Sequence, residues 1–186
     1  GCESGVFGGA LAIELGGRID LTRVLVSGGR ARFGGALAAS FTGQIGVDRG
    51  TFVGGAAQSA GASVYADTGG LVELKDSIVC CAVQGDLVFC AGGGVVADHS
   101  TVWNDDSGNI RVEWGGSCAD PTGSSGNLSV APGFCPGDPD FRIATSSPNA
   151  GTASDGGEGL RRIQRERFCR GACLLRLSGG GCCGTK

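Results

Sequence analysis

The sequence predicts an all-β protein whose chain winds into a parallel solenoid of about four coils. Three observations predict this fold: a repeat with a period near 25 residues, apolar and polar residues that alternate within each repeat, and glycine pairs between the repeats. Glycine supplies 38 of the 186 residues, without the period of three that collagen requires. Hydrophobic residues make up 41%, which is enough for a packed interior and argues against wholesale disorder.

The repeat is visible in both the glycines and the strands. The letters FGGAL occur at 7–11 and again at 33–37, 26 residues later. Four alternating segments follow each other at steps of 26, 27 and 23 residues, and they begin at Ile19, Ile45, Val72 and Val95. Alternation rich in β-branched residues is typical of strands. Each repeat is therefore expected to be one coil of two or three short strands.

Successive coils are expected to stack about 4.8 Å apart by parallel pairing, so that matching side chains form columns. The predicted buried column consists of Leu21, Val47, Leu74 and Ala97. The repeated glycines are expected at a corner where every coil turns sharply, with positive φ. A leucine-rich repeat would need its asparagine-and-leucine consensus, and a propeller blade needs about 40–45 residues, so both fit less well.

Three parts are expected along the chain. Residues 1–103 form the coils, and residues 104–152, dense in Gly, Ser, Pro, Asn and Asp, form a looped cap over the last coil. The apolar anchors of this cap are expected to be Phe134, Phe141 and Ile143. Residues 153–186 break the pattern as a basic, Cys-containing tail, disordered or loosely helical. The alternatives are an artefact of the gene's reading frame or a basic segment that binds an anionic surface.

The coil segments GGRIDLTRVLVSGG and GGLVELKDSIVCC resemble the right-handed parallel β-helix repeats of the pectate-lyase-like fold, as found in bacterial secreted and surface proteins. The segment GNLSVAPGFCPGDPDFRIATSSPNAGTA resembles the terminal segment of many such proteins, with Ala131 where aspartate is usual. The likeness covers residues 3–152. It implies a single-stranded right-handed β-helix in a secreted or cell-surface protein, and it implies no particular reaction.

Charge and hydropathy restrict the partners. Residues 1–151 hold 8 basic and 15 acidic residues, a net of −7, and residues 152–186 hold 7 and 3, a net of +4. An acidic body argues against nucleic acid as a partner. No run of 18 apolar residues occurs, so no membrane-spanning helix is expected. Because methionine and a leader are absent, we expect a processed monomer or part of a larger chain that has lost N-terminal coils.

The ten cysteines and the single histidine favour disulfides over a Cys/His zinc site. Disulfides require an oxidising compartment, which agrees with an extracellular location. Cys118 with Cys135 is the favoured pair, because these two residues bracket one loop rich in Gly, Pro and Ser. Cys80 or Cys81 with Cys90 is the second expectation.

Candidate site residues come from two outward columns, which are expected to lie side by side on one face: Thr22, Asp48, Lys75 and Asp98, and next to them Arg23, Arg49, Asp76 and His99. The resemblance implies a glycan groove, because lyases of this fold hold calcium with acidic residues and hydrolases use clustered aspartates. The candidate catalytic residues are then Asp48, Asp76, Asp98, Arg49, Lys75 and His99. No cofactor or metal is expected otherwise, and the resemblance allows only calcium, held by Asp48, Asp76 and Asp98. The alternative is a solvated charge ladder, in which each exposed pair contributes about 0–1 kcal/mol.

The favoured functional hypothesis is a non-catalytic secreted or cell-surface β-helix, structural, adhesin-like or carbohydrate-contacting, whose partners are polysaccharide or cell-surface components. The second hypothesis is a polysaccharide lyase or glycoside hydrolase that acts on acidic polysaccharide. Neither the lyase motif around a catalytic arginine nor the tandem-aspartate motifs of the hydrolases occur, so a non-enzyme is favoured. The triplet Asn127–Ser129 is a glycosylation acceptor if the source is eukaryotic.

Overall fold

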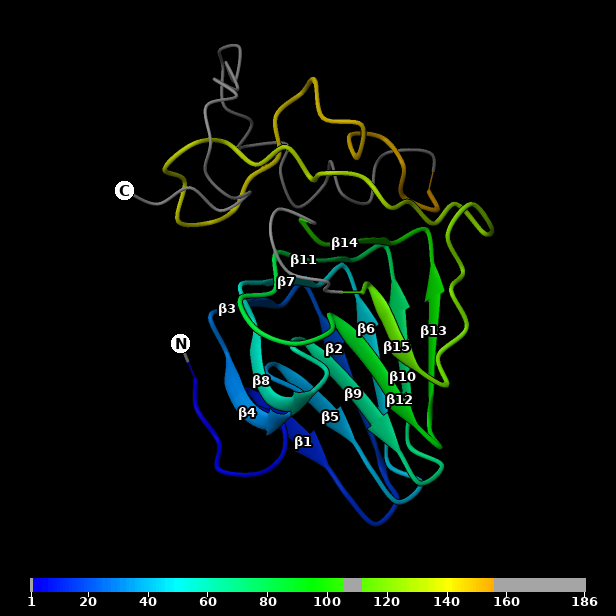
Figure 1. Cartoon of the computed structure of the whole chain (residues 1–186). Coiled ribbons are helices and arrows are strands. Elements are labelled where there is room, and N and C mark those ends of the chain that lie inside the picture. The colour runs from blue at the N-terminus through cyan, green and yellow to red at the C-terminus, as the bar shows by residue number, and fades with distance from the viewer. Residues whose placement is uncertain (1, 106–111, 156–186) are drawn as a thin grey trace.

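The computed structural model describes residues 2–105 and 112–155, and in these residues the chain forms a parallel β-solenoid with no helix (Figure 1). This confirms the predicted fold class. Residues 156–186, most of the predicted tail, lie outside the described residues. The strands are β1 Leu11–Ile13, β2 Arg18–Thr22, β3 Leu25–Ser27, β4 Arg30–Phe33, β5 Leu37–Ala39, β6 Gln44–Asp48, β7 Thr51–Val53, β8 Ala56–Ala60, β9 Val64–Asp67, β10 Leu71–Lys75, β11 Ile78–Cys80, β12 Val88–Ala91, β13 Gly94–Asp98, β14 Thr101–Trp103 and β15 Trp114–Gly116.

Strands at equivalent places in successive coils pair in parallel. The sheets have the orders β1-β5-β9-β12-β15, β2-β6-β10-β13 and β3-β7-β11-β14, and β4 pairs with β8 beside them. Figure 1 shows these sheets as the walls of the solenoid, with the chain advancing by one layer in each coil. Residues far apart in the sequence therefore become neighbours along the solenoid axis.

The predicted buried columns are confirmed in register. Ile19 pairs with Ile45, Ile45 with Val72, and Val72 with Val95. Two residues further on, the paired residues are Leu21, Val47, Leu74 and Ala97. In the second, third and fourth coils these side chains are at most 9% exposed. Because the side-chain period of a strand is two, the repeat spacing alone fixes which residues face inward.

The FGGAL repeats occupy the predicted corner. Gly8 and Gly34 have φ of 56° and 66°, a left-handed conformation that glycine adopts without steric cost. The second glycine of each pair serves a different purpose, because a Cβ on Gly9 would lie 2.1 Å from the Gly35 carbonyl oxygen. The same atom on Gly35 would lie 2.1 Å from the carbonyl oxygen of Ala62. One glycine thus makes the turn, and the other lets adjacent coils approach.

Stacking continues beyond residue 103. Strand β15 pairs with β12, and Leu128 forms a parallel bridge with Thr101 of β14. Residues 129–155, which we call the strap, then run back across the outer side of the β3-β7-β11-β14 sheet, as the yellow to orange segment of Figure 1 shows. The predicted cap residues therefore serve two purposes: some close the last coil, and the rest cover one side of the solenoid.

The predicted anchors hold the strap rather than a lid on the last coil. Ile143 is 1% exposed and clusters with Val53 and Ile78, which point outward from β7 and β11. Phe134 and Phe141 pack edge to face with ring centroids 5.4 Å apart and join the same cluster. The expected position over the last coil was wrong, because these two strands carry apolar side chains on their outer face and require a cover.

The disulfide in the described residues joins Cys90 and Cys118, whose Cα atoms are 5.0 Å apart. The expected pairing of Cys118 with Cys135 was therefore wrong, as was the pairing of Cys80 or Cys81 with Cys90. The physical reason is the pairing of β12 with β15, which places Cys90 opposite Gly116. Cys118 follows two residues later and lies beside Cys90.

Candidate functional site

The first predicted column lies on the outer face of the β2-β6-β10-β13 sheet. Asp48 pairs in register with Lys75, and Lys75 with Asp98. The two aspartate side chains are 38% and 45% exposed, and Lys75 is exposed as well. The lysine thus stands between two carboxylates, at steps of about 4.8 Å. This arrangement balances charge between coils.

The second predicted column forms a corner rather than part of the same face. Arg23, Arg49, Asp76 and His99 all have positive φ, at 57°, 60°, 49° and 47°. At this corner each coil bends from the β2-β6-β10-β13 sheet into the β3-β7-β11-β14 sheet. A left-handed residue occurs here in four successive coils, although none is glycine. The side chains therefore leave the corner in different directions from those of the strand residues before them.

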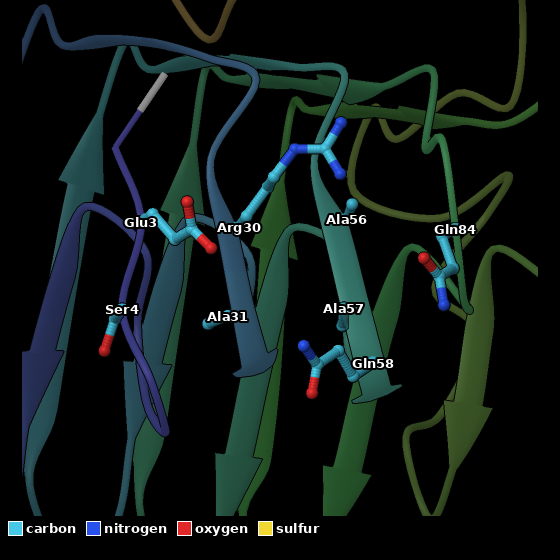
Figure 2. A pocket seen from close by; sticks show the side chains of 8 residues that line it. All are labelled: Glu3, Ser4, Arg30, Ala31, Ala56, Ala57, Gln58 and Gln84. Atoms are coloured by element: carbon cyan, nitrogen blue, oxygen red, sulfur yellow. The ribbon is translucent and has the colours of Figure 1, made fainter.

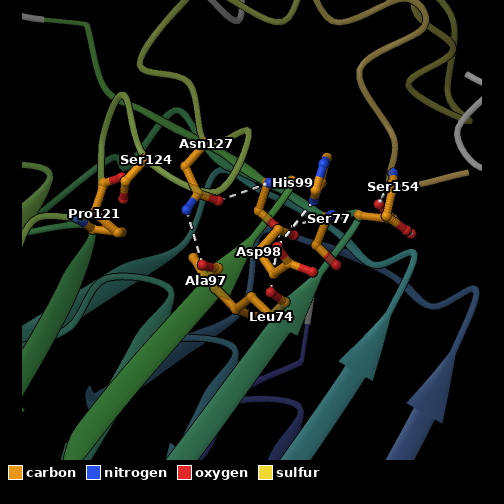
Figure 3. Close-up of polar contacts among 11 residues, drawn as sticks. Leu74, Ser77, Ala97, Asp98, His99, Pro121, Ser124, Asn127 and Ser154 are labelled. Carbon is orange, nitrogen blue, oxygen red and sulfur yellow. Dashed lines mark hydrogen bonds and ion pairs between the residues drawn. The ribbon is translucent and has the colours of Figure 1, made fainter. Parts of the chain in front are cut away.

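Asp76 is the clearest departure from the expected outward column. Its residue is 0% exposed, and its carboxylate accepts hydrogen bonds from the Ser154 backbone N–H at 2.7 Å and from the Ser154 hydroxyl at 2.8 Å. Figure 3 shows Ser154 on the strap segment that reaches this corner. The expectation that Asp76 faces solvent was wrong, because the strap returns over the corner and covers it. Asp76 fastens the strap to the third coil.

The strap is fastened to other coils too. In the fourth coil, the Thr101 hydroxyl donates a hydrogen bond to the side-chain oxygen of Asn149, which belongs to the strap. The Arg49 guanidinium lies 3.4 Å from the Asp155 carboxylate and 3.5 Å from that of Asp48. As the strap proceeds from residue 149 to 155, it therefore descends through three coils in order. Arg49, a predicted catalytic residue, makes this last contact.

His99 is paired with its sequence neighbour. Its Nδ1 lies 2.9 Å from an Asp98 carboxylate oxygen (Figure 3). The other side of the ring lies against Gly126, where a Cβ would stand 2.9 Å from Nε2. The imidazole is thus held between a carboxylate and the backbone that closes the last coil. This geometry suits a positioned surface histidine, and within residues 2–105 and 112–155 no hydroxyl is hydrogen-bonded to Nε2.

A buried polar ladder follows the corner residues, and sequence reasoning missed it. The Gly50 N–H donates to the Ser77 hydroxyl at 2.9 Å, and the Ser77 N–H donates to the Ser100 hydroxyl at 3.1 Å. The Ser100 N–H donates to the Asn127 side-chain oxygen at 3.0 Å (Figure 3). These side chains satisfy N–H groups that the corner removes from the sheets. The aligned repeats held the signal, since Gly50, Ser77 and Ser100 occupy one column.

Asn127 ends this ladder and is only 3% exposed. Its side-chain amide also donates to the Ala97 carbonyl at 2.8 Å. Both polar atoms of the amide are therefore engaged inside the fold. A glycan on this nitrogen would displace its hydrogen bond to the Ala97 carbonyl, so we expect the triplet to stay unmodified in the folded chain.

The three aspartates proposed for calcium do not converge in the described residues. Calcium takes six to eight oxygen ligands, whereas the Asp76 carboxylate faces the strap and Lys75 separates Asp48 from Asp98. Across residues 2–105 and 112–155, no three His, Cys, Asp or Glu side chains gather closely enough to hold a metal ion. These aspartates serve charge balance and strap contacts instead.

A second charged cluster lies near the other end of the same strands. The Arg18 guanidinium contacts Asp20 at 2.9 Å and reaches Glu73, two coils away, at 2.7 Å. The hydrogen bonds to Glu73 and Asp20 raise the pKa of Arg18 above its usual value. Gly46 stands between the two acids, and a Cβ there would lie 2.7 Å from the guanidinium. The missing side chain creates the path by which the arginine spans the middle coil.

A shallow hollow of about 110 Å³ lies on the side formed by β4 and β8. Its centre is a row of four residues in register: Glu3, Arg30, Ala56 and Gln84. Figure 2 shows these residues on four chain segments side by side, with Gln58 further along the strand that carries Ala56. Three steps of about 4.8 Å make this row about 14 Å long. The hollow therefore runs along the solenoid axis across four layers.

Small side chains form the floor of the hollow, and polar side chains form its rim. Ala31, Ala56 and Ala57 are buried beneath it, while the charged and amide side chains around it are exposed. Neither Arg30 nor Glu3 forms an ion pair within the described part of the chain. Sequence reasoning missed this feature, because Arg30 and the two glutamines lie in the glycine-containing stretches between the alternating segments.

An aromatic column follows the hollow along β4. Phe7, Phe33, Tyr65 and Phe89 stack along the axis, with neighbouring centroids 5.0–6.3 Å apart. Tyr65 is 5% exposed. Burial, with a smaller effect of the nearby Asp67 carboxylate, raises the pKa of Tyr65 to about 12. Because the rings stack on each other, the column stiffens this side of the solenoid.

No protein-family model, curated protein or solved structure significantly matches this chain. No helix in the described residues has the length and apolar character needed to cross a membrane. The architecture itself agrees with the predicted β-solenoid of about four coils.

Proposed function

We propose that this protein is a non-catalytic extracellular β-solenoid whose hollow along β4 and β8 contacts polysaccharide or other cell-surface glycans. The observation that carries the proposal is the group of exposed hydrogen-bonding side chains around a floor of alanines: Glu3, Arg30, Gln58 and Gln84. Hydroxyl-rich polymers are bound by such groups, since an amide both donates and accepts and a guanidinium donates in a fork. The hollow runs along the solenoid axis, and this direction suits an extended chain molecule.

Two further observations support this function. The disulfide between Cys90 and Cys118 is stable in an oxidising compartment, such as the outside of a cell. Both oxygens of the predicted catalytic acid Asp76 are bonded to Ser154 in the interior. A buried carboxylate with its acceptors engaged suits a structural contact better than acid or base chemistry on a polymer.

A glycan array probed with the labelled protein tests this proposal. We expect binding that Arg30→Ala lowers by about tenfold or more, because a lost charged hydrogen bond amounts to about 1.5–3 kcal/mol. Gln58→Ala should lower it less. Arg23→Ala is the matched control, since Arg23 is also an exposed arginine in the first coil but lies between β2 and β3, outside the residues that line the hollow. Unchanged binding by Arg30→Ala, or equal losses in both arginine variants, would contradict the proposed site.

An assay of turnover distinguishes the proposed function from the second hypothesis, a lyase or hydrolase of acidic polysaccharide. The protein is incubated with polygalacturonate and calcium, and unsaturated product is followed by its absorbance. Release of product that Asp48→Ala and Asp98→Ala abolish would support the enzyme and overturn the proposal. Binding of polysaccharide without release of product would support the non-catalytic β-solenoid.

A further inference from the structure

Two arginines occupy the exposed face of β4, beside the hollow. Arg30 and Arg32 are both exposed, while Ala31 between them is 4% exposed. Because alternate residues of a strand point to one face, both arginines leave β4 on the same side, with Cα atoms about 6.6 Å apart. Neither forms an ion pair within residues 2–105 and 112–155. Two neighbouring positive charges therefore face solvent together.

This pair differs from the other charges of the chain. Residues 1–151 hold 8 basic and 15 acidic residues, and in the described residues Arg18, Arg49 and Arg142 are each bound by a carboxylate. Strands β4 and β8 contain two arginines and no acid. Like charges on one face of a sheet repel each other, and no ion pair in the described chain relieves this repulsion. An anion bound by both arginines would relieve it.

The guanidinium of each arginine keeps donors available for such an anion. Arg30 makes no side-chain hydrogen bond in the described part of the chain, and Figure 2 shows its side chain directed from β4 toward β8, away from Glu3. Arg32 lies over the Phe33 ring, 5.2 Å from its centroid, and its Nε donates to the Ser59 hydroxyl oxygen at 3.4 Å. These contacts orient Arg32, and its two terminal nitrogens have no partner among the described residues.

A shift in strand register adds polar groups opposite Arg32. The pairing of β4 with β8 shifts after Ala31, so that two residues of β8, Gln58 and Ser59, stand opposite the single residue Arg32. Both are exposed, although strict alternation would hide one of them. Bulges of this kind re-aim side chains and are common next to functional sites. An amide and a hydroxyl therefore lie beside the arginines.

The number of these donors favours a tetrahedral anion. A carboxylate has two oxygens in one plane, which a single guanidinium fork can occupy. A sulfate or phosphate ester has three terminal oxygens in different directions, so it can accept from two guanidiniums and a neighbouring amide or hydroxyl at once. We propose that the glycan in the hollow carries such esters and that Arg30 and Arg32 together bind one of them. This inference rests on the proposed function and names the class of glycan.

Titration calorimetry of the full chain with dextran, dextran sulfate and dextran phosphate tests this proposal, because the three polymers share one backbone. We expect at least one ester to bind about tenfold more tightly than dextran, and the tighter ester identifies the anion. Arg32→Gln should lower the affinity for that ester by about tenfold, because charged hydrogen bonds are lost. Arg23→Gln is the matched control, since Arg23 is also exposed but lies between β2 and β3. Circular dichroism checks that both variants are folded.

The results separate this inference from the proposed function. If Arg30→Ala weakens binding on the glycan array but neither ester binds more tightly than dextran, the proposed function stands and this inference is wrong. If no glycan binds, both are wrong. Equal losses in Arg32→Gln and Arg23→Gln would also overturn the inference.

Two further polymers test the kind of anion. Polygalacturonate presents carboxylates on sugars, and polyglutamate presents carboxylates without sugar. We expect both to bind more weakly than the tighter dextran ester. If polygalacturonate binds as tightly as that ester, the site recognises carboxylates and the tetrahedral anion is wrong. If polyglutamate does so, charge alone decides binding, and the inference of an esterified glycan is wrong as well.

Discussion

Replacing Asp76 tests whether this acid is a structural or a chemical group. The residue is 0% exposed and accepts two hydrogen bonds from Ser154. Each hydrogen bond to a charged group contributes about 1.5–3 kcal/mol. Its φ of 49° is one that Asp and Asn adopt more readily than alanine. Asp76→Ala should therefore lower the free energy of unfolding by about 3–5 kcal/mol.

Urea unfolding followed by tryptophan fluorescence measures this loss, because Trp103 packs in the cluster that the strap covers. Asp76→Asn keeps one acceptor and the tolerance for positive φ, so its loss should be about 1–2 kcal/mol. Ser154→Ala combined with Asp76→Asn completes a double-mutant cycle, in which we expect a coupling of about 1–2 kcal/mol. Asp48→Ala is the matched control: its side chain is 38% exposed, and its loss should stay below about 1 kcal/mol.

The reasoning would be refuted if Asp76→Ala unfolded at the wild-type urea midpoint. It would also be refuted if the variant kept its stability and lost an activity on polysaccharide. Either result would mean that the strap does not depend on this carboxylate, and Asp76 would then regain its place among the catalytic candidates.

Four further predictions follow from the interior. Tyr65 is the single tyrosine, so ultraviolet titration should show a phenolate midpoint near 12 in the native protein and near 10.0 in the unfolded one. Because the pKa of Tyr65 is higher in the folded state, the contribution of this residue to stability is fully present below pH 10.0 and is lost as the pH rises toward 12. Equal midpoints in the native and unfolded protein would contradict this. Cys118→Ser should lower the free energy of unfolding by about 2–4 kcal/mol, measured in urea without reductant. Leu74→Ala should lower it by about 2–5 kcal/mol, and a loss below that range would mean that the column is loosely packed. Asn127→Ala should cost about 1–3 kcal/mol, and mass spectrometry of protein made in eukaryotic cells should find Asn127 unmodified.

The interior could be predicted residue by residue, and the reason is visible in one column. Ile19, Ile45, Val72 and Val95 begin alternating segments, and each pairs with the next in the structure. In a solenoid each coil contacts only its neighbours, so the spacing of the repeat contains the register. The row Asp48, Lys75 and Asp98 follows from the same argument, since it lies on the outer face of those strands.

The environments of the site residues could not be predicted in this way. Asp76 was expected on the surface, but the strap covers it, and its hydrogen-bond donor Ser154 lies 78 residues further along. Cys118 was assigned to the wrong partner, because its true partner became apparent only when β15 was seen to add a layer to β12. The hollow beside Arg30 arises from four layers that pair through stretches outside the alternating segments.

The amino-acid sequence by itself determined the coil, its interior columns and its turning glycines, because these depend on contacts that recur at a fixed spacing. The tertiary structure alone decided which surfaces remain free. The strap and strand β15 are held by single long-range contacts that leave no periodic signal in the sequence. The strap covers one side of the solenoid, and β15 adds a layer to β12. The hollow beside β4 and β8 is therefore defined by what those segments do not cover.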